Sequence, residues 1–184
     1  MGLLLPGTTI EVSGYENNAA DHVLSNIFAG GGIVLSQMCN LTGLEAHTVQ
    51  NWVKRGFVSA PQHRLYSRRQ FSRVVIINML KDSMKIDRGV QLISYINGVM
   101  NREEDASIDV TELYTRLVNL LGALESGYPS REAVQKAASA ILEDFVEQVP
   151  GSRQRIQKVL MVMVYAWLSA KAKQRAEFLM RDLF

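Results

Sequence analysis

The sequence contains few of the residues that build disulfides, metal sites or membrane spans. Its single cysteine, Cys39, excludes an internal disulfide, which fits a reducing compartment. The three histidines lack the close spacing of a zinc site and no other cofactor signature is present, so we expect neither a metal nor a cofactor. The longest apolar run, residues 159–168, is half as long as a membrane span of about 20 residues, and we interpret it as a buried helix.

Signals for export and for catalysis are missing as well. The first residues lack the basic start and the long apolar segment of a secretion signal, so we expect a cytoplasmic protein without a membrane partner. The three glycines at 30–32 lack the lysine of a phosphate-binding loop, and we expect them to form a flexible joint. Cys39 is expected to be a buried structural thiol, and no activated nucleophile is apparent. The sequence therefore predicts that the protein is not an enzyme.

Charge is distributed unevenly, although the net charge is only +2. Residues 1–44 carry three acids and no lysine or arginine, whereas residues 45–100 carry nine bases and three acids, a net charge of +6. Residues 101–150 carry four bases and ten acids (−6), and residues 151–184 carry seven bases and two acids (+5). A basic segment beside an acidic one suggests separate roles, with the basic segment facing a polyanion. Charge alone leaves open a chance cluster on a solvated face.

Apolar residues recur at helical spacing along almost the whole chain. We expect helices near residues 19–29, 34–40, 45–54, 67–79, 87–100, 109–124, 130–149 and 153–183. The predicted fold class is all-α with a minimal β wing. Three parts are expected: an N-terminal arm with a short helix (1–32), a winged helix-turn-helix (33–100), and a helical region for dimerisation or effector sensing (101–184).

The expected winged helix-turn-helix follows from two short helices and a small hairpin. The helices at 34–40 and 45–54 are joined by a turn at 41–44, in which Gly43 can supply the left-handed backbone of a tight turn. Phe57-Val58 and residues 64–66 are then predicted to pair as a hairpin with a polar, basic tip. Ser67 and Gln70 form a capping box that begins the next helix, and Asp109 and Glu112 form a second one.

Residues 48–58, from Thr48 through Trp52 to Val58, resemble the second helix of the MerR-like winged-helix domain and its exit into the wing. The spacing of Arg64, Tyr66, Ser67 and Arg68 is similar to the wing-to-helix signature of that domain. Asn51-Trp52-Val53-Lys54-x-Gly56, Pro61 and the pair Leu5-Pro6 resemble, more narrowly, an uncharacterised bacterial family of MerR-like proteins, a domain of unknown function. The resemblance implies a winged helix-turn-helix that binds DNA. It departs from MerR regulators at Gln50, where they usually carry arginine, and no long dimerisation helix follows directly.

The second helix of the motif is the expected reader of base edges in the major groove. Val49, Trp52 and Val53 are expected to face the core, with Trp52 as its anchor. The predicted base contacts are His47, Thr48, Gln50, Asn51 and Lys54. Asn and Gln can pair bidentately with adenine, and Lys can approach guanine. For Gln50 and Asn51, ordinary surface polarity is the alternative.

The predicted contacts to the DNA backbone come mainly from the wing. They are Arg55, Arg64, Tyr66, Arg68 and Arg69. Arginines bind phosphate oxygens and supply affinity without sequence preference. The hydroxyl of Tyr66 would donate to a phosphate, as the MerR resemblance implies.

The sequence thus predicts a DNA-binding transcriptional regulator of bacterial type, with double-stranded DNA as partner and a homodimer as the expected assembly. The effector stays open. One alternative is a helical protein-interaction module that retains the fold without binding DNA and docks through the helix at 159–168. Another is an excisionase-like architectural DNA binder, for which the helical region 101–184 would have no clear use.

Overall fold

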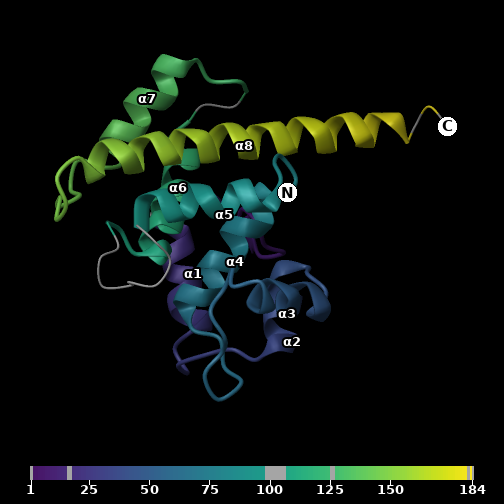
Figure 1. Cartoon of the computed structure of the whole chain (residues 1–184). Helices are drawn as coiled ribbons and strands as arrows, with labels where there is room; N and C mark the ends of the chain where they lie inside the picture. Colours follow the sequence, from purple (N-terminus) through teal and green to yellow (C-terminus); the bar gives the residue numbers. More distant parts are fainter. Residues whose placement is uncertain (1, 16–17, 98–106, 125–126, 182, 184) are drawn as a thin grey trace.

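The computed structural model describes residues 2–15, 18–97, 107–124, 127–181 and 183. Within these ranges the chain is mostly helical, which confirms the all-α prediction (Figure 1). The helices are α1 (Ala19–Ile27), α2 (Leu35–Thr42), α3 (Ala46–Lys54), α4 (Arg68–Leu80), α5 (Ile86–Asn97), α6 (Val110–Ala123), α7 (Arg131–Ala140) and α8 (Ser152–Met180). A helix is present near each predicted position, but the one predicted at 130–149 ends at residue 140. The last part of the helix expected at 87–100 lies outside the described residues.

Local capping explains where several helices begin. At α4, Ser67 Oγ accepts a hydrogen bond from the Gln70 amide (3.2 Å), and Gln70 Oε1 accepts one from the Ser67 amide (2.8 Å), so this predicted capping box is confirmed. At α6, Asp109 accepts from the Thr111 amide (2.7 Å), but Glu112 accepts from Arg116 instead of completing a capping box. The Glu112 carboxylate is thus paired with a basic side chain one helical turn further along α6.

The β structure differs from the prediction in two places. The N-terminal arm, expected to be irregular, contains β1 (Leu3–Leu4) paired antiparallel with β2 (Glu11–Val12). The expected hairpin between 57–58 and 64–66 is wrong, because Tyr66 pairs with Ile33 (2.7 and 3.0 Å). The amides of residues 57 and 58 donate to the Trp52 carbonyl oxygen and so extend the end of α3 (2.9 and 3.4 Å). The segment that the sequence predicts to be a wing is therefore paired with a residue more than thirty positions upstream.

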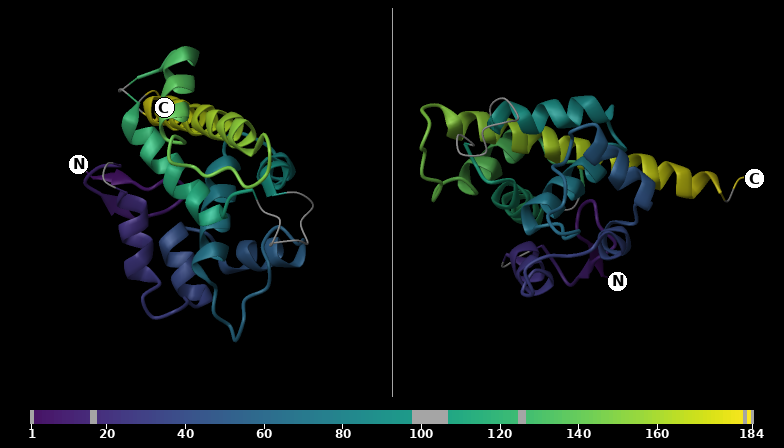
Figure 2. Two further views of the ribbon diagram at one scale, coloured as in Figure 1. Left: turned by 90° about the vertical axis from the view of Figure 1, so that its left-hand side faces the viewer. Right: turned by 60° about the horizontal axis from the view of Figure 1, so that its bottom comes forward.

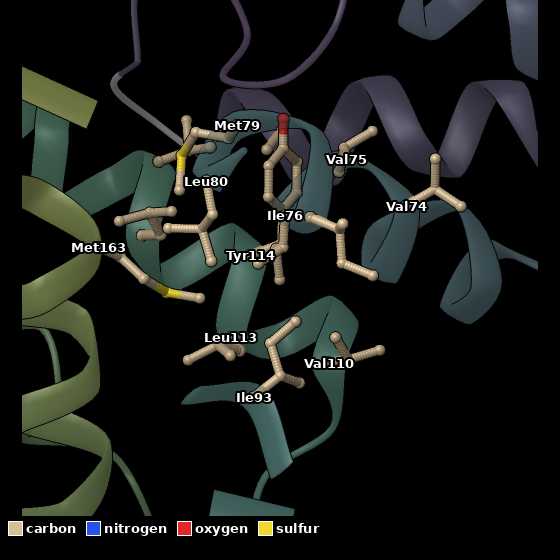
Figure 3. Close-up of a cluster of buried hydrophobic side chains, with 14 of the residues drawn as sticks. Val74, Val75, Ile76, Met79, Leu80, Ile93, Val110, Leu113, Tyr114 and Met163 are labelled. Carbon is tan, nitrogen blue, oxygen red and sulfur yellow. The ribbon is translucent and has the colours of Figure 1, made fainter. Parts of the chain in front are cut away.

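Helix α4 runs through the middle of the hydrophobic core. Its residues from 74 to 80 are all buried, so the β-branched run at 74–77 is accommodated in a part of the helix that is buried on every side. Figure 3 shows Ile76 of α4 among side chains from three other helices: Ile93 of α5, Leu113 of α6 and Met163 of α8. The buried cluster extends from Leu5 to Ala166 and includes residues on both sides of the predicted boundary at 100/101.

The N-terminal arm is held against this core by two buried polar side chains. Tyr114 Oη donates to the Pro6 carbonyl oxygen (2.8 Å), and burial raises the pKa of Tyr114. Asn78 Nδ2 donates to the carbonyl oxygens of Gly7 (2.9 Å) and Thr42 (3.0 Å). Asn78 therefore joins the arm to the turn after α2. Gly7 has φ +73°, and a Cβ there would lie 2.1 Å from the Val75 carbonyl oxygen.

Helix α8 crosses one side of the molecule and continues past it (Figures 1 and 2). Its first half packs on α4, α5, α6 and α7, whereas every residue from 171 to 181 is exposed. The prediction that residues 159–168 are buried is correct for one face only, because Val162 and Tyr165 are exposed. Val149, expected on a buried face, is also exposed, since α7 ends before it. None of the described helices is both long enough and apolar enough to cross a membrane.

Candidate nucleic-acid interface

Helix α3 presents a polar face to solvent and an apolar face to the core. Val49 and Trp52 are buried, with 3% of Trp52 exposed, so the prediction that they face inward is confirmed. Of the predicted base contacts, Thr48 is half-buried, and the exposed ones are His47, Gln50, Asn51 and Lys54. These four recur at spacings of three or four along the helix or are adjacent, which places them on the outer side. Helix α3 lies on the opposite side of the body from α8 (Figure 1).

The turn before α3 fixes the direction of the helix. Gly43 has φ +69°, and its amide donates to the Cys39 carbonyl oxygen at the end of α2 (2.8 Å). Thr42 Oγ1 donates to the Met38 carbonyl oxygen (2.7 Å) and accepts from the Leu44 amide (3.4 Å). Since Asn78 also holds the Thr42 carbonyl oxygen, α4 anchors this turn directly. This anchor was missed in the sequence, where Asn78 simply falls on the apolar face of its helix.

The loop from 57 to 66, hereafter the basic loop, protrudes below α3 in Figure 1. Gln62 and Leu65 pair through both backbone bonds (3.1 and 2.8 Å) around His63 and Arg64, whose φ angles are +48° and +66°. Two positive φ values are typical of a two-residue hairpin turn, and each costs a non-glycine residue about 1–2 kcal/mol. The turn therefore presents the Arg64 side chain at the exposed tip.

The base of the basic loop is held by Gln70 of α4. Its Nε2 donates to the carbonyl oxygens of Ser59 and Ala60, both at 2.9 Å, and lies 3.2 Å from Ser59 Oγ. Gln70 is buried and also completes the capping box of α4. The capping box in the sequence predicted only the first of these roles of Gln70, the cap of α4, and not its bonds to the loop. One side chain thus couples the start of α4 to the shape of the loop.

An open groove of about 510 Å³ lies between the start of α2, the helix α3 and the basic loop. Its lining is mainly apolar, with Gln50 and Arg64 among the polar side chains. Tyr66 also lines it but is only 4% exposed, which leaves little of the side chain for the predicted phosphate contact. Burial raises the pKa of Tyr66, so its hydroxyl keeps its proton and remains a donor.

Three of the arginines predicted to contact the DNA backbone form ion pairs with carboxylates. Arg55 Nη2 lies 2.9 Å from Asp87 of α5, and its guanidinium stacks on Phe57 at 4.2 Å. Arg68 lies 2.6 Å from Asp21 of α1, and Arg69 lies 3.5 Å from Asp109 at the start of α6. The three arginines are thus directed to acids from different parts of the chain, and the structure does not gather them into one cluster. Sequence spacing could not reveal these partners.

Lys54 and Arg64 differ from these arginines. Both are exposed, and neither forms an ion pair with any other residue that the structure describes. Lys54 is the last residue of α3. Arg64, in the basic loop, lines the groove together with Gln50 of α3. The outer face of α3 and the tip of the basic loop therefore adjoin one surface with two available cations.

The described residues contain no group of three His, Cys, Asp or Glu side chains that could hold a metal ion. Cys39 is half-buried and unpaired as a thiol, and burial, followed by the charge of Glu45, raises its pKa. A raised pKa disfavours the reactive thiolate.

Comparison with known proteins identifies a family but no function. The family described as Domain of unknown function (DUF1836) matches residues 25–117, which is just over half of the 184-residue chain. No curated protein and no solved structure matches the chain. The matched span begins in α1 and ends in α6, so it includes α3, the basic loop and their supports on α4.

Proposed function

We propose that this chain, which belongs to the DUF1836 family, binds double-stranded DNA as a bacterial-type transcriptional regulator in the cytoplasm. The observation that carries the proposal is the exposed polar face of α3 beside the basic loop. Helix α3 has nine residues. An α-helix with its side chains is about 10–12 Å across, and the major groove is about 12 Å wide. A helix of this size can enter the groove with its outer side chains against the base edges.

In this proposal, α2, the turn at Gly43 and α3 form a helix-turn-helix, and the basic loop is its wing, as in MerR-like proteins. Gln50 and Asn51 are placed to read bases because amide side chains pair bidentately with adenine. Lys54 and Arg64 flank them and supply contacts to guanine and to phosphate. The proposal is supported by the two buried anchors, Val49 and Trp52, which hold this face outward.

The ion pairs of Arg55, Arg68 and Arg69 are compatible with DNA binding. The three pairs are all partly exposed, with side-chain exposures between 31% and 63%. An exposed pair of this kind contributes about 0–1 kcal/mol, so a phosphate can displace the carboxylate at little cost. Arg64 would contact a phosphate without first leaving an ion pair. Arg55, Arg68 and Arg69 would exchange their carboxylate partners for phosphates when DNA binds.

The proposal is tested by fluorescence anisotropy with duplexes selected from a random pool, over a series of salt concentrations. We expect binding that weakens as salt rises, because phosphate contacts release counterions. Asn51→Ala should change the preferred sequence, with discrimination falling by about 1–3 kcal/mol at the affected base pair. Arg64→Ala should weaken all duplexes alike and lower the salt slope by about 1.

Lys136→Ala on α7 is the matched control for Arg64→Ala. It removes one exposed positive charge far along the chain from α3 and should leave the affinity unchanged. Absence of salt-dependent binding would contradict the proposal and favour a protein-interaction module. The exposed apolar side chains of Phe178, Leu179 and Met180 at the end of α8 are the observation on which that second candidate function stands.

A further inference from the structure

The groove between α2, α3 and the basic loop has the size and the lining of a small-molecule site. Its volume of about 510 Å³ lies within the range of roughly 300–1,000 Å³ that is typical of such sites. Three elements line it, so the packing of the fold shapes the groove and no single segment does. The apolar part of the lining includes Val34, Leu35, Val53 and Pro61, and the polar part includes Gln50 and Arg64.

The apolar walls of the groove stay accessible in the folded chain. Val34 is 39% exposed, and Leu35 and Val53 are half-buried. Covering this surface with an apolar molecule is favourable, because it removes apolar surface from water. A DNA phosphate gains little from such walls, so the DNA contacts proposed above leave this property of the groove without a use.

The charge around the groove favours an anion. Residues 33–66, which include α2, α3 and the basic loop, contain three bases and one acid. The acid, Glu45, lies just before α3 and does not line the groove, whereas Arg64 lines it and has no ion pair among the described residues. At the start of α2, Val34 is the N-cap and offers no side-chain acceptor to the amides of the first turn. A helix start of this kind also attracts negative charge.

We propose that the groove binds a small molecule with an apolar body and one carboxylate. The apolar body packs on Val34, Leu35 and Val53, and the carboxylate accepts hydrogen bonds from the Arg64 guanidinium. Gln50 and Arg64 are also the proposed contacts to DNA, so the bound molecule and DNA exclude each other. This exclusion rests on the proposed function, whereas binding of the small molecule does not.

Binding is tested on the full-length chain without DNA, by isothermal titration calorimetry with 2-naphthoate, a rigid bicyclic carboxylate. The matched control is 2-naphthylmethanol, which has the same apolar body and no charge. We expect saturable binding of naphthoate and about tenfold weaker binding of the alcohol, because the alcohol cannot pair with Arg64. Equal affinity of the two probes would overturn the proposal, and so would the absence of saturation by naphthoate in the millimolar range. Inorganic phosphate that binds more tightly than naphthoate would indicate a DNA phosphate site and would overturn it too.

Substitutions test whether the probe lies in the groove. Arg64→Gln should weaken naphthoate binding about tenfold, because it removes the cation. Arg88→Gln is the control, since Arg88 is an exposed arginine of α5 outside the groove, and it should leave the affinity unchanged.

Val34→Asp supplies a carboxylate from the chain itself. It should weaken naphthoate binding at least as much as Arg64→Gln, because the new side chain repels the ligand and caps the first turn of α2. Aspartate is a favoured N-cap residue, so thermal denaturation should show this variant to be no less stable than the wild type. Unchanged naphthoate binding in either Arg64→Gln or Val34→Asp would place the probe elsewhere and overturn the proposal.

Exclusion of DNA is tested by fluorescence anisotropy with the selected duplex. Saturating naphthoate should release the duplex, whereas the alcohol at the same concentration should not. A duplex that stays bound would overturn the exclusion. A chain that binds naphthoate but no duplex would contradict the proposed function and leave the ligand site supported. A chain that binds the duplex but not naphthoate would overturn the ligand site alone.

Discussion

At the scale of single residues, Gly7 is the position where the N-terminal arm has the least room. Its φ of +73° disfavours any side chain, and a Cβ would lie 2.1 Å from the Val75 carbonyl oxygen. Gly7→Ala should therefore lower the free energy of unfolding by about 3 kcal/mol, combining a left-handed backbone with overpacking against α4. Urea denaturation followed by circular dichroism measures this difference.

Gly14→Ala is the control for that substitution. A Cβ at Gly14 would have no atom within 4 Å, and its backbone is not left-handed. Alanine there should leave stability unchanged or raise it slightly, because it restricts the unfolded chain. Equal losses at both positions would mean that the arm is not packed on α4 as described.

At the scale of secondary-structure elements, Gln70 connects the start of α4 with the basic loop. Ser67→Ala should cost about 1 kcal/mol of stability, the usual effect of losing an N-cap side chain. Gln70→Ala should cost about 2–3 kcal/mol, because the hydrogen bonds to Ser59 and Ala60 are lost as well and leave those carbonyl oxygens unpaired.

Hydrogen exchange separates these two variants further. In Gln70→Ala the amides of Gln62 and Leu65, which close the tip of the basic loop, should exchange faster than in the wild type. In Ser67→Ala they should be unchanged. Identical loop protection in both variants would show that Gln70 acts on α4 alone.

The helices could be predicted because their signals are local. The Ser67 and Gln70 cap and the apolar repeat of Val49 and Trp52 lie within a few residues of the structure that they specify. The same repeat allowed the outer face of α3 to be predicted. Whether that face contacts DNA stays a prediction.

The pairing of the basic loop could not be predicted, because the partner of Tyr66 is Ile33 and no short-range pattern links them. The ion pairs of the candidate interface were missed for the same reason. Arg68 and its partner Asp21 are 47 residues apart and come together because α1 and α4 both pack on α6. Long-range contacts of this kind depend on how the helices pack in the core, and the spacing of apolar residues along the sequence does not predict that packing.

At the scale of the whole molecule, the acids of one part of the chain neutralise cations of another. Asp87 on α5 lies 2.9 Å from Arg55 beside the candidate interface. Asp87→Asn should raise affinity for duplex DNA about threefold, because it frees Arg55 and removes a charge that repels phosphate; this is within the range expected for an exposed pair. Fluorescence anisotropy at several salt concentrations measures the change.

Asp82→Asn is the matched control, because it changes the net charge by the same amount as Asp87→Asn. It removes one acid beside Lys81, at 3.5 Å, which is not among the proposed DNA contacts. Affinity should rise less than in Asp87→Asn. If the two variants gain equally, net charge alone accounts for the effect and Arg55 has no particular part in it.

The contacts of the N-terminal arm also constrain the order in which the protein can be completed during synthesis. The hydroxyl of Tyr114 holds the carbonyl of Pro6 across 108 residues, and Asn78 holds the neighbouring Gly7. Translation delivers the arm first and its partners much later. The arm therefore leaves the ribosome before α4 and α6, which hold it, and a nascent chain halted before α6 would expose the apolar side of α4 that the folded protein buries.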